Sequence, residues 1–332
     1  MQLLDAMAGR RVVVIGDAML DRYLIGDTDR LSPEAPVPVV TVRSTRWALG
    51  GAANVAANIV AIGSHALLPG AVGADAHANQ IRAELAAANI ADGYLVEVTD
   101  RPTTTKTRVV ARGQQVVRID EESDRPLDAS DTEKVWAAVE ALLASADALV
   151  LEDYNKGTLT PSLIRRAIEA ARLRRIPVVV DPKYHHFFEY RGATVFKPNR
   201  RELEAALGAE VNFAVDPGTL AAARERLGVE HLLVTLGAEG MVLSSPDAAP
   251  RQIPSRAREV FDVSGAGDTV TAWVAVALAA GATVDEAAYL ANYAAGLEVA
   301  KAGVATVAPA EVLRTYDAEH DAIGHLRRGG LI

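Results

Sequence analysis

The feature that most constrains the fold of this sequence is a series of short apolar runs, each closed by a polar or glycine residue. The first run, residues 12–15, reads Val-Val-Val-Ile and is followed by Gly16 and Asp17. Continuous runs of β-branched residues are typical of strands buried on both faces, as in a parallel sheet covered by helices. Similar runs occur at residues 148–152, 177–181, 194–197 and 231–236. Those before residue 194 alternate with alanine-rich stretches of helical character, which predicts an α/β protein with a mainly parallel sheet.

Two segments depart from this pattern. Residues 37–42 and 103–120 alternate apolar and polar residues as antiparallel strands do, and residues 112–114, Arg-Gly-Gln, offer a hairpin turn. We expect a small antiparallel sheet, a lid that projects from the body, with strands from about residues 18–43 and 100–120. No linker, low-complexity tract or internal repeat is visible, so residues 1–332 are expected to form a single domain that carries this lid.

Composition excludes several classes of function. The 43 acidic residues outnumber 34 basic ones, so the chain lacks the positive footprint that binds nucleic acid or an anionic membrane. Cysteine is absent, which excludes disulfides, thiolate metal sites and cysteine nucleophiles. The most apolar stretch, residues 270–284, is shorter than the ~20 residues that a membrane span needs and is expected to be a buried helix. The N-terminus does not resemble a secretory signal, so we expect a cytoplasmic protein with small-molecule partners.

The strongest local signal is residues 262–269, Asp-Val-Ser-Gly-Ala-Gly-Asp-Thr, directly before an apolar helical stretch. Its glycines let the backbone turn so that several amides point at one place, and the helix adds its positive N-terminal end, which suits an anion. Asp268 would repel a phosphate there unless it takes a proton from the group that attacks the phosphate. An ordinary N-cap would use the same residue types, and the residues alone leave both interpretations open. The motif matches neither a Walker A loop nor a complete dinucleotide fingerprint.

A second glycine motif, Gly50-Gly51, precedes a helical stretch that begins near Asn54. Paired glycines allow a ligand to approach the backbone, and the Asn54 amide could bind a sugar hydroxyl; tight helix packing explains the same residues. Asp17 follows the first predicted strand, where open α/β sheets bind ligands. Its carboxylate could accept bonds from hydroxyls or cap a loop.

Two further strand ends carry candidate ligand residues. After the run at 194–197, Asn199 and Glu202 lie three residues apart, a spacing that suits either a hydrated Mg²⁺ ion or a helix capping box. Residues 235–240, Thr-Leu-Gly-Ala-Glu-Gly, could face a nucleotide or form a plain turn. The seven histidines form no metal pattern, and zinc peptidase and serine hydrolase motifs are absent.

Taken together, the order and context of Gly50-Gly51, the Asn199 to Glu202 motif and residues 262–268 resemble the ribokinase-like, or PfkB, family of sugar kinases. The resemblance covers essentially the whole chain and implies a ribokinase-like three-layer αβα sandwich. A finer resemblance is to the D-glycero-β-D-manno-heptose 7-phosphate kinases of ADP-heptose and lipopolysaccharide inner-core synthesis. It is carried by residues 20–23, 32–40, 101–106, 114–120 and 181–183. Many such kinases are fused to a nucleotidyltransferase with a His-x-Gly-His motif, which this sequence lacks, so a stand-alone kinase is expected.

The resemblance implies a reaction and a set of roles. ATP would phosphorylate the anomeric hydroxyl of heptose 7-phosphate, with Asp268 as the base and the amides of Gly265, Ala266 and Gly267 as the anion hole. The residues implied for the sugar hydroxyls are Asp17, Gly50, Gly51 and Asn54. For the existing 7-phosphate we expect Arg108 and Lys183, with Arg22 and Lys106 as alternatives. The ATP residues implied are Lys197, Asn199, Thr235, Gly237, Gly240 and Asn292, with Glu202 for Mg²⁺. Family members often pair through their lids, so a homodimer is expected.

Three alternatives remain open at the level of sequence. Another PfkB sugar, sugar-phosphate or nucleoside kinase would use the same base on a different acceptor. A nucleotide-linked oxidoreductase would also use glycine-rich turns, although the first strand lacks the full fingerprint. A sugar sensor without catalytic activity would not need the Asp268 carboxylate.

Overall fold

The structure, a computed structural model, describes residues 2–211 and 217–328. Its body is a ten-stranded sheet with the order β14-β13-β12-β11-β10-β9-β1-β5-β6, to which β4 adds by pairing with β1. The strands of this sheet are β1 (Arg11–Gly16), β4 (His65–Leu67), β5 (Gly70–Gly73), β6 (Leu95–Val98), β9 (Ala148–Glu152), β10 (Val178–Asp181), β11 (Val195–Phe196), β12 (His231–Thr235), β13 (Met241–Ser244) and β14 (Arg251–Ile253). All pairings from β6 to β12 are parallel, and only β13 and β14 pair antiparallel.

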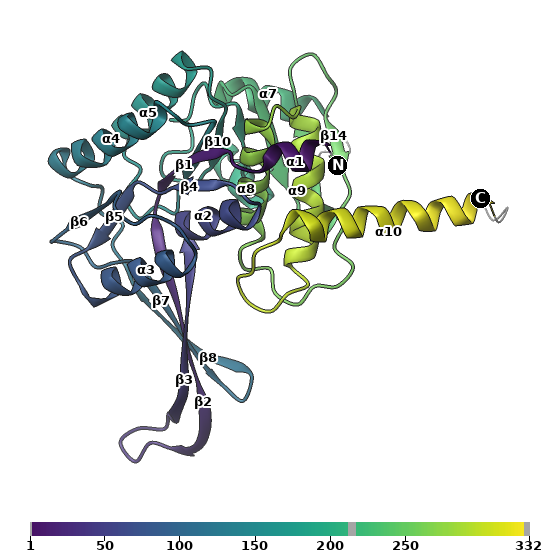
Figure 1. Ribbon diagram of the computed structural model, residues 1–332. Helices are drawn as coiled ribbons and strands as arrows, with labels where there is room; N and C mark the ends of the chain where they lie inside the picture. Colours follow the sequence, from purple (N-terminus) through teal and green to yellow (C-terminus); the bar gives the residue numbers. More distant parts are fainter. Residues whose placement is uncertain (1, 212–216, 329–332) are drawn as a thin grey trace.

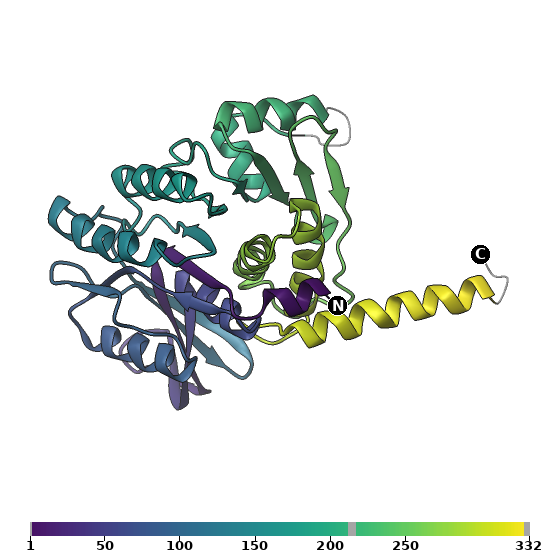
Figure 2. The ribbon, with the colours of Figure 1, turned by 45° about the horizontal axis from the view of Figure 1, so that its top comes forward.

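Helices cover both faces of the sheet and make a three-layer sandwich (Figures 1 and 2). One face packs against α1 (Gln2–Met7), α2 (Ala52–Ala61), α3 (Ala76–Ala87), α8 (Ala266–Ala279) and α9 (Val284–Glu298). The other face packs against α4 (Ala129–Leu143), α5 (Pro161–Leu173), α6 (Arg200–Leu207) and α7 (Pro217–Leu227). Strand β1 illustrates how the sheet is buried on both faces. Val12 and Val14 pack in the core on the first face, whereas Val13 and Ile15 pack in the core on the second. The α/β sandwich predicted from sequence is confirmed.

A second sheet of four strands, the lid, projects from the body (Figure 1). Its order is β3-β2-β7-β8, with β2 (Ala18–Leu31), β3 (Pro38–Gly51), β7 (Thr105–Ala111) and β8 (Gln114–Glu121). The two outer pairings are antiparallel, and the central β2–β7 pairing is parallel. Strand β3 continues to Gly51, beyond the residue 43 expected from sequence. The predicted hairpin turn joins β7 to β8, where Arg112 and Gly113 have φ of 51° and 76° as a type I′ turn requires.

The apolar stretch at 270–284 forms one buried helix, α8, followed by a turn, and only its last residue, Val284, belongs to the next helix. Helix α8 begins earlier, at Ala266, and ends at Ala279; Gly281, with φ of 88°, separates it from α9. Helix α8 is buried along most of its length, as expected. Across the residues that the structure describes, no helix combines the length and apolar character needed to cross a membrane. The last described helix, α10 (Pro309–Arg328), extends away from the body (Figure 2).

Candidate active site

The first turn of α8 presents free backbone amides. Gly265 is the N-cap, with a φ of 98° that favours glycine, and no side chain caps this helix. Within the described chain, the amides of Gly265, Gly267 and Asp268 have no hydrogen-bond acceptor, and the amide of Ala266 reaches the Val263 carbonyl only at 3.4 Å. Unpaired amides at a helix N-terminus bind anions. The N-cap interpretation of Asp268 is therefore wrong: its carboxylate does not cap α8.

The Asp268 carboxylate is instead held by two side chains from other elements. Asn54 Nδ2 on α2 donates to Oδ2 at 2.6 Å, and the Tyr154 hydroxyl donates to Oδ1 at 2.7 Å. Burial raises the pKa of Asp268 to about 6, although the bonds from Asn54 and Tyr154 and the charge of Lys197 act in the opposite direction. A carboxylate with this pKa is ionised at neutral pH and still basic enough to accept a proton in catalysis.

Asp268 lines a cavity of about 240 Å³ between the body and the lid. The residues around it are Met19, Asp21, Gly50, Gly51, Asn54, Lys106, Arg108, Arg118, Tyr154, Ser264, Gly265, Asp268 and Val304. We call this space the acceptor cavity. It brings together the predicted residues Gly50, Gly51, Asn54 and Arg108 with Asp268 and Gly265.

The glycine pair in the acceptor cavity has a steric reason. A Cβ atom on Gly50 would lie 2.9 Å from Oδ2 of Asp21, and one on Gly51 would lie 2.4 Å from the Asp17 carbonyl oxygen. Gly51 also has a φ of 54° at the start of α2. Any side chain at these positions would displace neighbouring atoms, so the backbone itself forms the wall of the cavity.

A second cavity of about 350 Å³ lies on the other side of the α8 turn, and we call it the nucleotide groove. Its lining includes Ala266 and Gly267 together with the predicted residues Asn199, Thr235, Gly237, Gly240 and Asn292. One helical turn therefore borders both cavities: Gly265 and Asp268 face the first, and Ala266 and Gly267 face the second. Lys197 is buried beneath this turn, where it pairs with Asp181 at 2.8 Å. A Cβ atom added to Gly267 would lie 3.5 Å from Nζ of Lys197.

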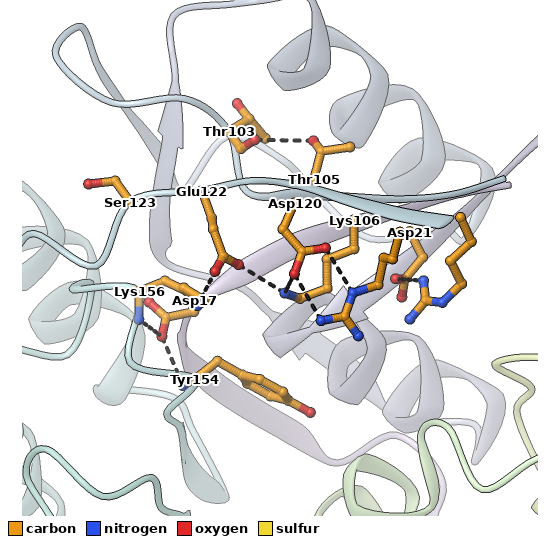
Figure 3. A network of polar contacts seen from close by, with 12 residues as sticks. Asp17, Asp21, Thr103, Thr105, Lys106, Asp120, Glu122, Ser123, Tyr154 and Lys156 are labelled. Carbon is orange, nitrogen blue, oxygen red and sulfur yellow. Dashed lines mark hydrogen bonds and ion pairs between the residues drawn. The ribbon is translucent and has the colours of Figure 1, made fainter. Parts of the chain in front are cut away.

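Asp17 does not reach the acceptor cavity. Its Oδ2 accepts hydrogen bonds of 2.9 Å from the amides of both Tyr154 and Lys156 (Figure 3). Its Oδ1 accepts one of 3.1 Å from the amide of Thr158. Among the described residues, the Asp17 carboxylate thus accepts hydrogen bonds only from backbone amides of the loop after β9. The loop-capping interpretation is the one the geometry supports, and Asp17 acts on the site by holding Tyr154 in place.

Lys183 and Glu202 lie together, outside the acceptor cavity. Glu202 completes a capping box with Asn199, in which each side chain accepts a 2.9 Å bond from the other residue's amide. The second Glu202 oxygen binds Lys183 Nζ, which lies 5.2 Å from the centre of the Tyr154 ring. Lys183 is therefore engaged outside the cavity that Arg108 lines, and Glu202 has both carboxylate oxygens engaged.

Strands of the lid supply cationic side chains that the sequence did not single out as a group. Lys106 binds Glu122 at 2.9 Å and Asp120 at 3.4 Å, and Arg118 binds Asp120 at 2.9 Å (Figure 3). Glu122 also binds Lys156 of the loop after β9 at 2.8 Å, which ties the lid to the body. Arg108 pairs with Asp21. Three cations from β7 and β8 thus reach the acceptor cavity at fixed positions.

Sequence analysis missed several residues of the site. Asp21 and Arg118 lie in segments 20–23 and 114–120, which carried the resemblance, but the sequence predicted no role for them. Tyr154 lies in no recognised motif, and the folded lid and loop bring all three to the cavity. Glu152 and Asp181 lie under the α8 turn, and they could have been found: each is the last residue of a parallel strand, where ligands bind in open α/β sheets.

Comparison with known proteins gives a consistent result. The model of the family described as "pfkB family carbohydrate kinase" matches residues 10–311. The chain is 47% identical over 312 residues to the bifunctional protein HldE of Pelobacter propionicus, which covers 93% of this chain and 63% of that protein. It is 47% identical over 302 residues to HldE of Azorhizobium caulinodans, covering 91% and 63%. The chain therefore spans about 63% of the length of these curated relatives.

Solved structures share the fold. Arabidopsis thaliana ribokinase, solved with ribose and ATP, superposes with a TM-score of 0.71 at 24% identity, covering 92% of this chain and 98% of that one. Phosphofructokinase-2 from Escherichia coli, solved with potassium, gives a TM-score of 0.73 at 19% identity, covering 94% and 99%.

Proposed function

Because the chain belongs to the pfkB family of carbohydrate kinases, we propose that it phosphorylates the anomeric hydroxyl of D-glycero-D-manno-heptose 7-phosphate. The products are heptose 1,7-bisphosphate and ADP. The observation that carries this proposal is the position of Asp268, a buried carboxylate in the wall of the acceptor cavity whose own helical turn also borders the nucleotide groove. A phosphoryl group that crosses from one cavity to the other has to pass this turn.

The acceptor is inferred from the resemblance to heptose 7-phosphate kinases and from the charge of the cavity. Lys106, Arg108 and Arg118 line it, although a neutral sugar needs no cluster of cations. An acceptor that already carries a phosphate dianion would use charge-assisted hydrogen bonds to such side chains. We therefore assign the 7-phosphate to the three lid cations Lys106, Arg108 and Arg118. Of the pair expected from the sequence, this assignment keeps Arg108 and drops Lys183.

In the proposed mechanism, Asp268 accepts the proton of the attacking hydroxyl. Asn54 and Tyr154 hold the carboxylate from either side, so that its orientation does not depend on the substrate. The amides of Gly265, Ala266 and Gly267 stabilise charge on the transferring phosphoryl group, and such preorganised donors supply much of the catalysis in phosphoryl transfer. Closure of the lid would exclude water that could otherwise hydrolyse ATP.

ATP and Mg²⁺ complete the proposal. Asn199, Thr235, Gly237, Gly240 and Asn292 border the groove for ATP, with Lys197 beneath the phosphates. Mg²⁺ would neutralise phosphate charge. Glu202 has both oxygens engaged by Asn199 and Lys183, so it fits a Mg²⁺ ion only through an intervening water. Carboxylates that are free to bind a cation lie elsewhere in the site.

The rival functions differ in what they require. Membership of a carbohydrate kinase family leaves the oxidoreductase without support, since no complete dinucleotide fingerprint follows β1. A sensor would have no use for a base held by two hydrogen bonds. The alternative that needs an experiment is a kinase of the same family that uses the same base on a different acceptor.

Release of ADP tests the proposal. The purified chain is assayed with ATP and heptose 7-phosphate, with fructose 6-phosphate and ribose as control acceptors. We expect kcat/KM to be at least about a hundredfold higher for heptose 7-phosphate than for ribose, the loss expected when charged hydrogen bonds to a phosphate cannot form, and higher than for fructose 6-phosphate, which carries its phosphate on a different sugar. Equal or better turnover of either control would contradict the assigned acceptor.

Pairing of two chains through the lid, and a cytoplasmic location, belong to the same proposal. Seven large apolar side chains of the lid are exposed: Ile25, Leu31, Val37, Val42, Val116, Val117 and Ile119. Exposed apolar residues that gather on one element are typical of protein interfaces. Sedimentation of the chain should show a dimer, and Val117→Lys should shift it toward the monomer; a monomer for the parent chain would contradict this part. A cytoplasmic location fits the use of ATP.

A further inference from the structure

Glu152, the last residue of β9, is a buried carboxylate with no hydrogen-bond partner. Its side chain is fully inaccessible, and neither Oε1 nor Oε2 has a partner in the part of the chain that the structure describes. An ionised carboxylate buried in this way is strongly destabilising unless a cation is bound next to it. The group is therefore either protonated or a ligand.

Two further carboxylates face Glu152. Asp181 of β10 is its register partner on the neighbouring parallel strand, so the two side chains lie side by side at the end of the sheet. Asp268 approaches from the first turn of α8. One carboxylate oxygen from each of the three lies within 4.8 Å of the others, and all three residues are buried.

Neither nearby ammonium bonds to Glu152, although the charges of Lys197 and Lys183 lower its pKa. Lys197 Nζ binds Asp181 Oδ2 at 2.8 Å, and Lys183 is engaged by Glu202. Asp268 already accepts bonds from Asn54 and Tyr154. Burial, together with the charges of Asp181 and Asp268, raises the pKa of Glu152 well above its ordinary value. Three carboxylates thus share one directly bound ammonium, which leaves an excess of negative charge.

We propose that Glu152 and Asp181, with Asp268 opposite them, form a binding site for a divalent cation such as Mg²⁺ that is occupied even without nucleotide. Hard divalent cations select carboxylate oxygens, and Mg²⁺ keeps several waters and uses only one or two carboxylates directly. Two metal–oxygen bonds of ~2.1 Å place opposite ligands about 4.2 Å apart, close to the spread of the three oxygens. Glu152 supplies the ligand that has no other partner.

The position of this site connects it to catalysis. A Cβ on Gly267 would lie 3.6 Å from Asp181 Oδ2, so the cation site is directly beneath the amides of the anion hole. The inference deepens the proposed function, on which it rests for the role of the cation in phosphoryl transfer. It differs from the expectation based on the sequence, which placed Mg²⁺ at Glu202.

Direct metal binding tests the inference without ATP or sugar. The full chain is titrated with Mn²⁺, and the free ion is followed by electron paramagnetic resonance. We expect one saturable Mn²⁺ per chain, displaced by Mg²⁺, and a rise in Kd of at least about tenfold in Glu152→Gln, since even the loss of an outer partner of a metal ligand has such an effect. Glu97→Gln, at an exposed ion pair on β6, is the matched control and should bind Mn²⁺ as the parent chain does, whereas Glu202→Gln tests the site expected from the sequence.

Circular dichroism confirms that each variant is folded, and Asp181→Asn serves as a second variant if Glu152→Gln is not. Absence of saturable Mn²⁺ binding by the parent chain would overturn the inference. So would parental affinity in Glu152→Gln and Asp181→Asn, or loss of binding only in Glu202→Gln. Because no substrate is present, a wrong acceptor assignment leaves this result unchanged, whereas Mn²⁺ binding with no turnover of heptose 7-phosphate would contradict the proposed acceptor alone.

Discussion

The Tyr154 hydroxyl donates a hydrogen bond of 2.7 Å to Oδ1 of Asp268. This contact joins the loop after β9 to the first turn of α8, 114 residues later in the chain. Asn54 holds the other oxygen of the same carboxylate at 2.6 Å. The carboxylate that we propose as the base is therefore oriented by residues from two other elements before any substrate arrives, and this preorganisation leads to the first two predictions.

Replacement of the base should act on turnover. Asp268→Asn keeps the shape of the side chain but cannot accept the proton, so kcat is expected to fall by about 10² to 10⁴ with a modest change in KM. Steady-state kinetics with ATP and the sugar phosphate measure both constants. Near-normal turnover would remove Asp268 from this role.

Removal of the tyrosine hydroxyl should move the pH profile. The hydrogen bond from Tyr154 lowers the pKa of Asp268, which is about 6, so Tyr154→Phe raises it further. A base acts when it is deprotonated; the acid limb of kcat/KM should therefore move to higher pH, by about one unit for a bond to a charged group. Tyr184→Phe, at an exposed tyrosine of the adjacent segment, should leave the limb in place. An unchanged limb in Tyr154→Phe would show that another group titrates.

The cations of the lid should determine the affinity for the acceptor phosphate. Arg118→Ala removes one charge from the acceptor cavity, and KM for heptose 7-phosphate should rise about tenfold, the effect of one charge-assisted hydrogen bond. Lys183→Ala removes a cation that lies outside the cavity and should change this KM little. Acceptor kinetics of both variants provide the comparison, and the opposite order would favour Lys183.

The penalty for an acceptor that lacks its phosphate gives an independent check. Heptose without the 7-phosphate should compete poorly against the parent enzyme. The same loss should matter far less in Arg108→Ala, because the partner of the phosphate is already missing there. Identical penalties in the two proteins would mean that Arg108 does not contact the phosphate.

A buried glutamate behind the anion hole should make stability depend on pH. Glu298 is inaccessible to solvent, and a Cβ on Gly265 would lie 3.2 Å from its Oε1. Burial raises the pKa of Glu298 to about 8, above the value of a glutamate in the unfolded chain. The unfolded chain then loses its proton first, so the free energy of unfolding should fall as pH rises from about 4.5 to 8, by at most about 1.4 kcal/mol per pH unit.

Glu298→Gln should reduce this dependence, because the amide has no proton to lose. Urea unfolding of both proteins across that range measures the difference. A parent chain whose stability rises between pH 5 and 8 with the same slope as the variant would contradict the assignment.

The sequence predicted the strands β1, β9, β10, β11 and β12 and the glycine turns well, because each depends on local physics, but it did not predict β4, β5, β6, β13 or β14. The β-branched runs end within a residue or two of β1, β9, β10 and β12, and residues 262–269 do form a helix start with free amides. The sequence could not predict which partner each charged side chain binds in the folded chain. Asp17 caps a loop 137 residues away, and Lys183 turns to Glu202 instead of the acceptor cavity. Tyr154 and Arg118 reach the site only because the loop after β9 and the lid converge there.

The junctions between the body and the lid have a mechanical consequence. A single residue, Asp17, separates β1 from β2, and β3 passes into α2 with no residue between them. Any swing of the lid would therefore bend the backbone at Asp17 and at the Gly51 peptide, as well as in the connections from β6 to β7 and from β8 to α4. Asp17 also caps the loop that carries Tyr154, and Gly51 lines the acceptor cavity, where we propose that the sugar binds. Opening the lid would thus change the wall of the proposed sugar site and the support of the proposed base in one movement.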